Sequence, residues 1–228
     1  MQFIHIDKYK LSLERYGSEF ILITSVEQKN LIPLSEAIYK AELNFTEEVI
    51  GTDDEICLKL RSPFNKTSIK QLESIQLDKR SQPNKYILPV HFNDHQDWRA
   101  IEDYSRKSRE EIIDELIKTN LTFHMHGFLP GFLYISGLPE YLHCPRKATP
   151  SKRVEAGTIA IGGPYLGLYS CSSPGGWYSI GRCPLIVFDP SQEPPTSLRH
   201  GDTVLLESVS KEAYHTHIDR KLDSDHYG

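Results

Sequence analysis

The stretch HMHGFLPGFLYISG, residues 124–137, marks the point where the texture of the sequence changes. From here onward Gly and Pro recur every few residues between short β-prone runs, which are Phe132–Ile135, Thr158–Ile161, Leu185–Phe188 and Thr203–Leu206. Short strands separated by Gly and Pro turns predict a closed or nearly closed β-barrel. The polar tail after Ser208 is expected to fray.

Residues 1 to about 82 contain little glycine and show clear apolar periodicity. Leu31, Leu34 and Ile38 recur at the spacing of an amphipathic helix. A second helix is expected over about 64–75, and strands are expected around 21–23 and 56–60. This alternation of strands and helices is typical of a small α+β layer.

The polar, proline-containing segment Ser81–Asn84 predicts a domain boundary. After it, a strand is expected over 86–92 and two helices over about 97–107 and 109–119, the second begun by a capping box of Ser108 and Glu111. The predicted domains are therefore 1–82, an α+β domain, and 83–228, a β-barrel domain with a helical insertion at about 97–119 and a polar C-terminal tail.

Composition excludes several classes of protein. The 228 residues are 39% hydrophobic and carry a net charge of −5, which disfavours a protein that grips nucleic acid. No apolar run approaches the roughly 20 residues that span a bilayer, and the first residues do not resemble a secretory signal. The four cysteines form no CxxC pair, so we expect free thiols in a reducing compartment and a cytoplasmic protein.

Two histidines, His124 and His126, precede the Pro130–Gly131 pair. On a strand, His124 and His126 would point to the same face, where paired imidazoles can bind a metal. A third ligand at useful spacing is missing, so no metal is predicted, and a polar barrel face or a substrate-facing histidine is favoured. Pro130 and Gly131 predict a tight turn with a positive φ at glycine.

A second Gly-rich turn follows Pro174. Gly175 and Gly176 allow close approach of the backbone and expose amides, and Trp177 can form the wall of a pocket. The alternative is a barrel turn with a buried tryptophan anchor. Three arginines lie among these loops, and a guanidinium group can bind an anion through two parallel hydrogen bonds. Each of them could instead be an ordinary surface arginine or part of an ion pair; they are Arg146, Arg153 and Arg182.

Two glycine patterns imitate nucleotide loops. Residues 176–183 have the GxxxxG spacing, but they carry Arg182 in place of lysine and Cys183 in place of a hydroxyl. Residues 162–167 open no predicted helix, which a dinucleotide fingerprint needs. The residues themselves therefore predict a β-barrel with Gly-rich loops that are able to bind a small anion, and they predict nothing more specific.

Taken together, these segments resemble a bacterial family. Residues 127–139, GFLPGFLYISGLP, are similar to the GFxPGFxYLxGLP segment of the B subunit of 5-oxoprolinase, also called allophanate hydrolase subunit 1, a family that includes kinase-inhibitor proteins of sporulating bacteria. The resemblance continues through CPRKATP at 144–150 and VEAGTIAIGG at 154–163, and it extends over about 123–206. Departures from the family pattern lie at 92–98, at 165–170 and in the His-Met-His run at 124–126.

The resemblance implies a fold and an activity. The fold is a small α+β N-terminal domain followed by a cyclophilin-like β-barrel. The implied activity is that of an ATP-dependent complex that opens 5-oxoproline to glutamate and uses Mg-ATP. This chain would be its B subunit and would work with a larger homologous C subunit and an A subunit. The chain alone is expected to be inactive. Alternatives are a binding protein that inhibits a sensor histidine kinase, a carboxyltransferase or allophanate hydrolase-related subunit, and a degenerate subunit kept for assembly.

Roles within that activity are assigned residue by residue. Arg146 and Arg182 are the anion-binding candidates, and Arg182 has the alternative of pairing with Asp189 or Asp202 inside the barrel. His126 is the candidate general base. The remaining candidates shape the binding site through backbone amides, a turn and a wall; they are Gly175, Gly176, Pro130, Gly131 and Trp177.

Overall fold

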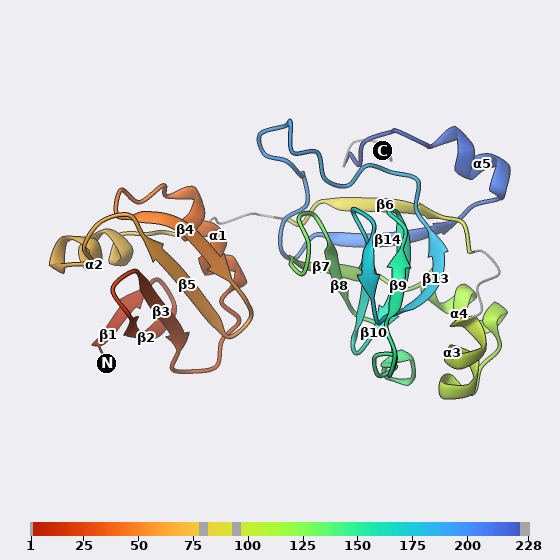
Figure 1. The fold of residues 1–228 in the computed structure, drawn as a ribbon, viewed down its shortest axis with the longest axis horizontal. Coiled ribbons are helices and arrows are strands. Elements are labelled where there is room, and N and C mark those ends of the chain that lie inside the picture. The colour runs from red at the N-terminus through yellow and green to blue at the C-terminus, as the bar shows by residue number, and fades with distance from the viewer. Residues whose placement is uncertain (1, 78–81, 93–96, 224–228) are drawn as a thin grey trace. The chain divides into compact units, whose positions relative to one another are not determined.

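The computed structural model describes residues 2–77, 82–92 and 97–223 of the chain (Figure 1). The chain divides into two compact units, Met1–Ser81 and Gln82–Gly228, and each has an apolar core of its own. The linker predicted at 81–84 begins with Ser81, which lies outside the described residues.

The first unit is a five-stranded antiparallel sheet with helices packed on it. The strand order is β1-β2-β3-β5-β4. The elements are β1 (Gln2–Ile6), β2 (Tyr9–Tyr16), β3 (Phe20–Ser25), α1 (Ile32–Lys40), β4 (Thr46–Gly51), β5 (Glu55–Leu60) and α2 (Lys66–Glu73).

Apolar periodicity accounts for these elements. Ile21 and Ile23 on β3 are both buried, because alternate residues of a strand face the same side. On α1 the predicted stripe is buried at Leu34 and Ile38. Asn65 begins α2 by accepting hydrogen bonds from the first amides of the helix. The helices and strands expected in this half are confirmed.

The second unit contains a seven-stranded sheet in the order β13-β10-β11-β8-β7-β14-β6. Neighbouring strands are antiparallel, except that β14 and β6 are parallel. The strands are β6 (Lys85–Val90), β7 (Leu121–His126), β8 (Leu133–Ser136), β10 (Thr158–Gly162), β11 (Tyr165–Leu168), β13 (Tyr178–Arg182) and β14 (Thr203–Ser208).

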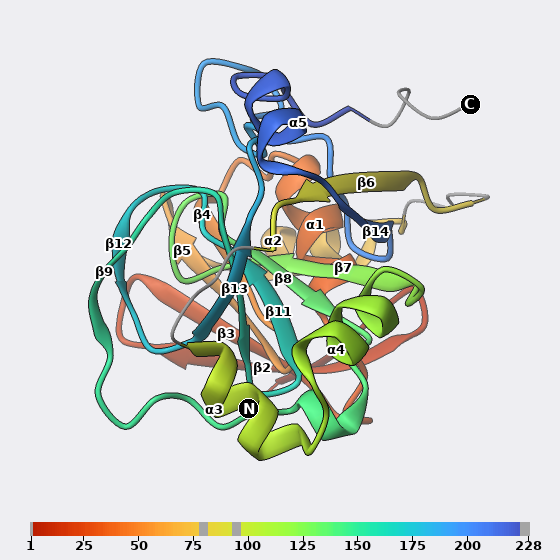
Figure 2. The ribbon, with the colours of Figure 1, turned by 90° about the vertical axis from the view of Figure 1, so that its right-hand side faces the viewer.

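The sheet curls until its two edge strands meet. His91, just after β6, and Arg182, the last residue of β13, exchange two backbone hydrogen bonds of 2.9 Å. The sequence predicts a closed or nearly closed barrel, and the sheet joins its edges at this pair. A ribbon of β9 (Ser151–Val154) and β12 (Ser173–Gly175) lies beside the curled sheet (Figure 2).

The helical insertion consists of α3 (Asp97–Ser105) and α4 (Arg109–Leu116), which lie together at one end of the sheet (Figures 1 and 2). The capping box predicted for α4 is confirmed: the Ser108 hydroxyl accepts from the Glu111 amide, and the Glu111 carboxylate accepts from the Ser108 amide. Among the described residues, no helix has both the length and the apolar character needed to cross a membrane.

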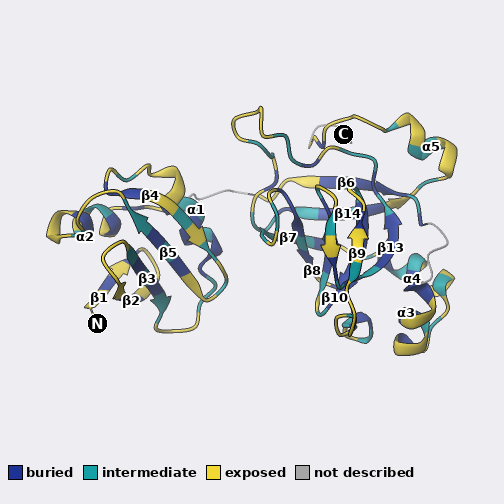
Figure 3. Cartoon of the chain, in the orientation of Figure 1, coloured by how far each residue is buried: buried dark blue, intermediate teal, exposed yellow. Residues whose placement is uncertain are grey.

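Strand alternation sends side chains of β8, β10 and β11 to two different clusters. One set faces the apolar core of the curled sheet and consists of Leu133, Ile135, Ile159, Ile161, Leu166 and Leu168. Residues that alternate with them, in these strands or directly beside them, face the other side and form an aromatic cluster with Val154 and Trp177; they are Phe132, Tyr134, Ala160, Tyr165 and Tyr169. Strand β10 is buried throughout, whereas the ribbon carries exposed residues (Figure 3).

One predicted strand is wrong. Residues 185–188 form no strand, and Ile186 alone makes an isolated bridge, to Lys221. Pro184 and Pro190 flank the segment and have no amide hydrogen to donate to a ladder, which leaves little room for regular pairing.

The prediction that the tail frays after Ser208 is wrong up to residue 223. Helix α5 (Lys211–Thr216) begins after Ser210, whose hydroxyl accepts from the Ala213 amide. Leu222 is buried against the core of the second unit, and Lys221 pairs with Asp189 at 2.7 Å. Leu222 and the Lys221–Asp189 ion pair therefore anchor the segment. Residues 224–228 lie outside the described part of the chain.

Candidate functional site

The aromatic cluster is hollowed by a cavity of about 160 Å³. Segments far apart in the sequence supply its wall: the loop before β8, the loop before β9, the end of β11, and the turn between β12 and β13. The lining residues are Phe128, Phe132, Tyr134, Arg146, Lys147, Pro150, Tyr169, Gly175, Gly176 and Trp177.

A tight loop between β7 and β8 carries the exposed aromatic edge of the cavity. The Gly127 amide donates to the Phe132 carbonyl at 3.3 Å, which closes the loop on itself. Gly131 has φ +73, and a Cβ there would lie 2.2 Å from the Phe188 side chain, so only glycine fits. Phe128 is 60% exposed and contacts the Phe132 ring edge-on at 5.5 Å.

Phe132 is the centre of the aromatic wall. Its ring makes edge-to-face contacts with Tyr134 and Tyr169, both at 5.0 Å, and with Trp177 at 5.5 Å. Edge-to-face contact at these distances is a preferred geometry for aromatic pairs. The rings form apolar walls of the cavity, and two phenol groups lie at its boundary.

Both tyrosines keep their protons at neutral pH. Burial raises the pKa of Tyr169 to about 12, the neighbouring Tyr134 adds to the rise, and the charge of Arg146 opposes it. Burial likewise raises the pKa of Tyr134, again opposed by Arg146. A neutral phenol donates one hydrogen bond, so these groups suit an oxygen acceptor.

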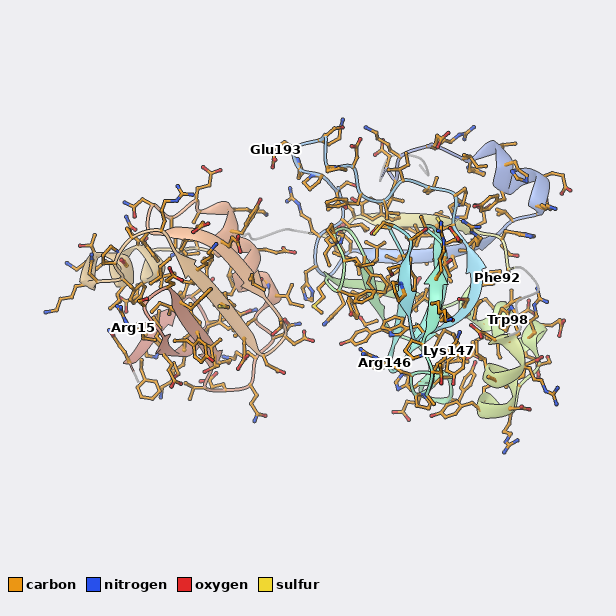
Figure 4. The ribbon with its side chains drawn as sticks, in the orientation of Figure 1. Arg15, Phe92, Trp98, Arg146, Lys147 and Glu193 are labelled. Carbon is orange, nitrogen blue, oxygen red and sulfur yellow. The ribbon has the colours of Figure 1, made fainter. Side chains whose placement is uncertain are left out.

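Arg146 brings positive charge to the cavity. It is exposed, lines the cavity, and its charge acts on both tyrosines there. Lys147 is its neighbour in the chain (Figure 4). Lys147 also lines the cavity, but its side chain is only 13% exposed, and its ammonium donates to Asp97 at 2.5 Å. The cation that faces solvent at this site is therefore Arg146.

The turn after β12 completes the wall. A Cβ on Gly175 would lie 2.3 Å from the Tyr169 hydroxyl oxygen, so only glycine lets the strand approach that ring. The Gly176 carbonyl accepts from the Lys147 amide at 2.7 Å. This bond ties the turn to the loop that carries Arg146.

Several residues predicted from sequence come together at this cavity. Arg146, Gly175, Gly176 and Trp177 all line it. Pro130 and Gly131 belong to the adjacent loop but do not line the cavity. The Pro130 carbonyl accepts from the Ser170 hydroxyl at 2.6 Å, which holds that loop beside the end of β11.

The two histidines do not share a face as predicted. A register shift between Phe123 and Met125 interrupts the alternation of β7. The His126 ring contacts Phe123 at 4.8 Å, whereas the His124 ring contacts Tyr165 at 5.4 Å. His126 does not line the cavity, and burial lowers its pKa to about 4, although backbone groups of the following loop act in the opposite direction.

Arg182 also lies outside the cavity lining. Its guanidinium donates to the Ala156 carbonyl at 2.8 Å, and its backbone joins the two edges of the curled sheet through His91. The alternative that Arg182 pairs with Asp189 or Asp202 is not what the structure shows: Asp189 pairs with Lys221, and Asp202 accepts hydrogen bonds from backbone amides. Of the two predicted anion binders, the structure places only Arg146 at this cavity.

Residues 13–198 match the family model described as carboxyltransferase domain, subdomain C and D. The match spans both units and includes every residue that lines the cavity. The chain belongs to the carboxyltransferase-domain family.

Relatives of this carboxyltransferase domain include two proteins that are named as the B subunit of 5-oxoprolinase. The protein from Bacillus subtilis (strain 168) is 37% identical over 121 residues, 53% of this chain and 50% of the relative. The protein from Haemophilus influenzae (strain ATCC 51907 / DSM 11121 / KW20 / Rd) is 45% identical over 109 residues, 48% of this chain and 51% of the relative. The chain thus spans about half the length of the curated relatives it matches.

A solved structure shares the fold of this carboxyltransferase domain. The crystal structure of TTHA0988 in space group P212121 superposes with a TM-score of 0.71 at 25% identity, and the match covers 88% of this chain and 40% of that one. The arrangement of strands and helices described above is therefore a known arrangement within larger proteins.

Sequence reasoning missed part of the site in this carboxyltransferase domain. Phe128 and Lys147 lie in the motifs at 127–139 and 144–150, and Tyr169 lies in the departure at 165–170, but these patterns do not mark the three side chains as the wall of a cavity. Asp97, which holds Lys147, is 50 residues away in the chain. The aromatic residues in and beside the β-prone runs that follow His124 are the sequence signal that could have indicated an aromatic wall.

Proposed function

We propose that this chain is the B subunit of a 5-oxoprolinase-type complex that opens 5-oxoproline to glutamate with ATP. The complex would contain a larger homologous C subunit, together with an A subunit, and it would work in the cytoplasm. The relatives named for 5-oxoprolinase and the carboxyltransferase-domain match support this proposal. All four cysteines are free thiols, which agrees with a reducing compartment. We expect the barrel to be cyclophilin-like.

The observation that carries the proposal is the cavity. A small cyclic amide with one carboxylate needs apolar contact for its ring, a cation for its carboxylate and donors for its carbonyl oxygen. The cavity offers aromatic rings, the exposed Arg146, and the protonated hydroxyls of Tyr134 and Tyr169. We assign Arg146 to the carboxylate because its guanidinium can bind both oxygens.

Opening a stable lactam requires activation. The lactam carbonyl oxygen attacks the γ-phosphorus of ATP, and ADP leaves. Water then adds to the lactam carbonyl carbon and the C–N bond breaks, which gives an acyl phosphate and a free amine. A second water then releases inorganic phosphate and glutamate. Pockets for larger ligands hold roughly 300–1,000 Å³. The cavity, at about 160 Å³, is smaller, so we assign Mg-ATP to another site in the complex.

The test is reconstitution. The chain is purified alone and together with its larger homologue and the third component of the complex, and 5-oxoproline-dependent ADP release is measured. We expect activity in the assembled complex and none in the chain alone. Turnover by the isolated chain would reject the division of labour, and no turnover in a stable assembly would reject the substrate. Suppression of sensor kinase autophosphorylation by the chain alone would favour the inhibitor alternative.

A further inference from the structure

Asp97 lies behind the cavity wall rather than in it. It is the first residue of α3, and its side chain is 9% exposed. One carboxylate oxygen, Oδ2, accepts from the Lys147 ammonium at 2.5 Å and from the Ser179 amide at 2.8 Å. Ser179 is on β13, two residues after Trp177, so this oxygen reaches two segments of the wall.

Lys147 extends the connection. Its ammonium also donates to the Ser151 hydroxyl at 3.2 Å, at the start of β9. Its own amide donates to the Gly176 carbonyl at 2.7 Å. The carboxylate of Asp97 thus joins the helical insertion to the loop that carries Arg146 and to the strand that follows the Gly175–Trp177 turn.

Because Asp97 and Lys147 are both largely buried, loss of either charge is expected to destabilise this connection. A charged group taken out of water is stable only when its counter-charge and hydrogen bonds are in place. If Asp97 loses its charge, Lys147 has no carboxylate on that side, and its ammonium gains by moving toward solvent. Because Arg146 is the adjacent residue, such a movement displaces the guanidinium that faces the cavity.

We propose that Asp97 is a positioning residue, which fixes Lys147 and through it the placement of Arg146 and Gly176 around the ligand. The identity of the ligand rests on the proposed function, whereas the placement of the wall does not. Two measurements therefore separate them, one without ligand and one with 5-oxoproline.

The first measurement is amide hydrogen exchange in the full ligand-free chain. In D97N we expect the amides of Lys147 and Ser179 to exchange about tenfold faster, because the bonds that they make at this wall loosen. The amide of Leu205 on β14 serves as an internal reference and should not change. The matched variant is I101A, which removes a buried side chain of the same helix without touching the carboxylate.

The second measurement is calorimetric titration of 5-oxoproline into the full chain. We expect D97N to raise Kd about tenfold, a loss of about 1.4 kcal/mol of binding free energy, because Arg146 and Gly176 are no longer held in place. In a K147M background the same change should alter Kd less than about twofold, since the effect passes through Lys147. We expect I101A to lower the melting temperature without raising Kd.

Unchanged exchange at Lys147 and Ser179 in D97N would overturn the proposal. So would an I101A variant that weakens binding as much as D97N, because the role of Asp97 would then be general stability. If the wild-type chain does not bind 5-oxoproline, the proposed ligand is rejected, and the exchange measurement alone decides whether Asp97 positions the wall.

Discussion

The two units use their sheets differently. In the first, buried side chains such as Ile23, Leu34 and Leu58 fill the space between one sheet and its helices. In the second, the same strands carry an aliphatic core on one face and aromatic rings around a cavity on the other. The aliphatic residues fill a closed core, whereas the aromatic rings, packed edge to face, also form the wall of a cavity.

The largest expected effect comes from comparing one buried side chain in each unit. W177A removes the ring that contacts Phe132 and Tyr134, and it should lower the free energy of unfolding by about 3–5 kcal/mol. L58A, in the core of the first unit, should cost a similar amount, about 2–5 kcal/mol. Denaturant unfolding measures both.

Ligand binding separates these two variants. At a temperature where both remain folded, W177A should abolish detectable binding of 5-oxoproline, because it removes part of the wall, and L58A should bind as the wild type does. Equal loss of binding in both variants would mean that the cavity depends on global stability rather than on its rings.

A smaller effect concerns pH and His126. Burial holds its pKa at about 4, below its usual 6.5, so the unfolded chain binds this proton more readily than the folded one between these values. Stability is therefore fully present above about pH 6.5 and falls as the pH drops toward 4, by about 3 kcal/mol if the whole shift is expressed.

The check is denaturant unfolding of the wild type and H126F across that pH range. Phenylalanine keeps a ring against Phe123 and removes the titrating group. The difference in stability between the two proteins should grow in favour of H126F as the pH falls. A difference that does not vary with pH would show that His126 is not held neutral by burial.

The smallest effect is expected at Arg182. R182K keeps the charge but loses the bond geometry at the Ala156 carbonyl, and it should lower the free energy of unfolding by about 1 kcal/mol. Because Arg182 does not line the cavity, the Kd for 5-oxoproline should not change. A melting curve and a titration measure these quantities, and weakened binding with unchanged melting would return Arg182 to the anion site.

Local sequence patterns predicted those features of the fold that depend only on residues close together in the chain. The spacing of Leu34 and Ile38 and the pair Ser108 and Glu111 each specify a helix feature, and the structure confirms them. The register shift in β7 could not be predicted, because alternation assumes an uninterrupted strand. His126 was therefore expected on the wrong face.

The candidate site was predictable only in part for the same reason. Arg146, Gly176 and Trp177 stand in short, conspicuous motifs. Tyr169 and Asp97 join them through strand pairing and a buried ion pair that connect distant segments. Those relations depend on tertiary structure, which composition and spacing do not contain.

The central claim is that this cavity binds a small carboxylate through Arg146. Calorimetric titration of 5-oxoproline into the wild type, R146A and R153A tests it most directly. Arg153 is the matched control, since it is an exposed arginine on β9 that pairs with Glu155 at 2.7 Å and does not line the cavity. We predict that R146A raises Kd at least about tenfold, as expected for a lost charge-assisted bond, with an unchanged melting temperature, while R153A binds as the wild type does. Equal affinity in R146A and the wild type would contradict the account.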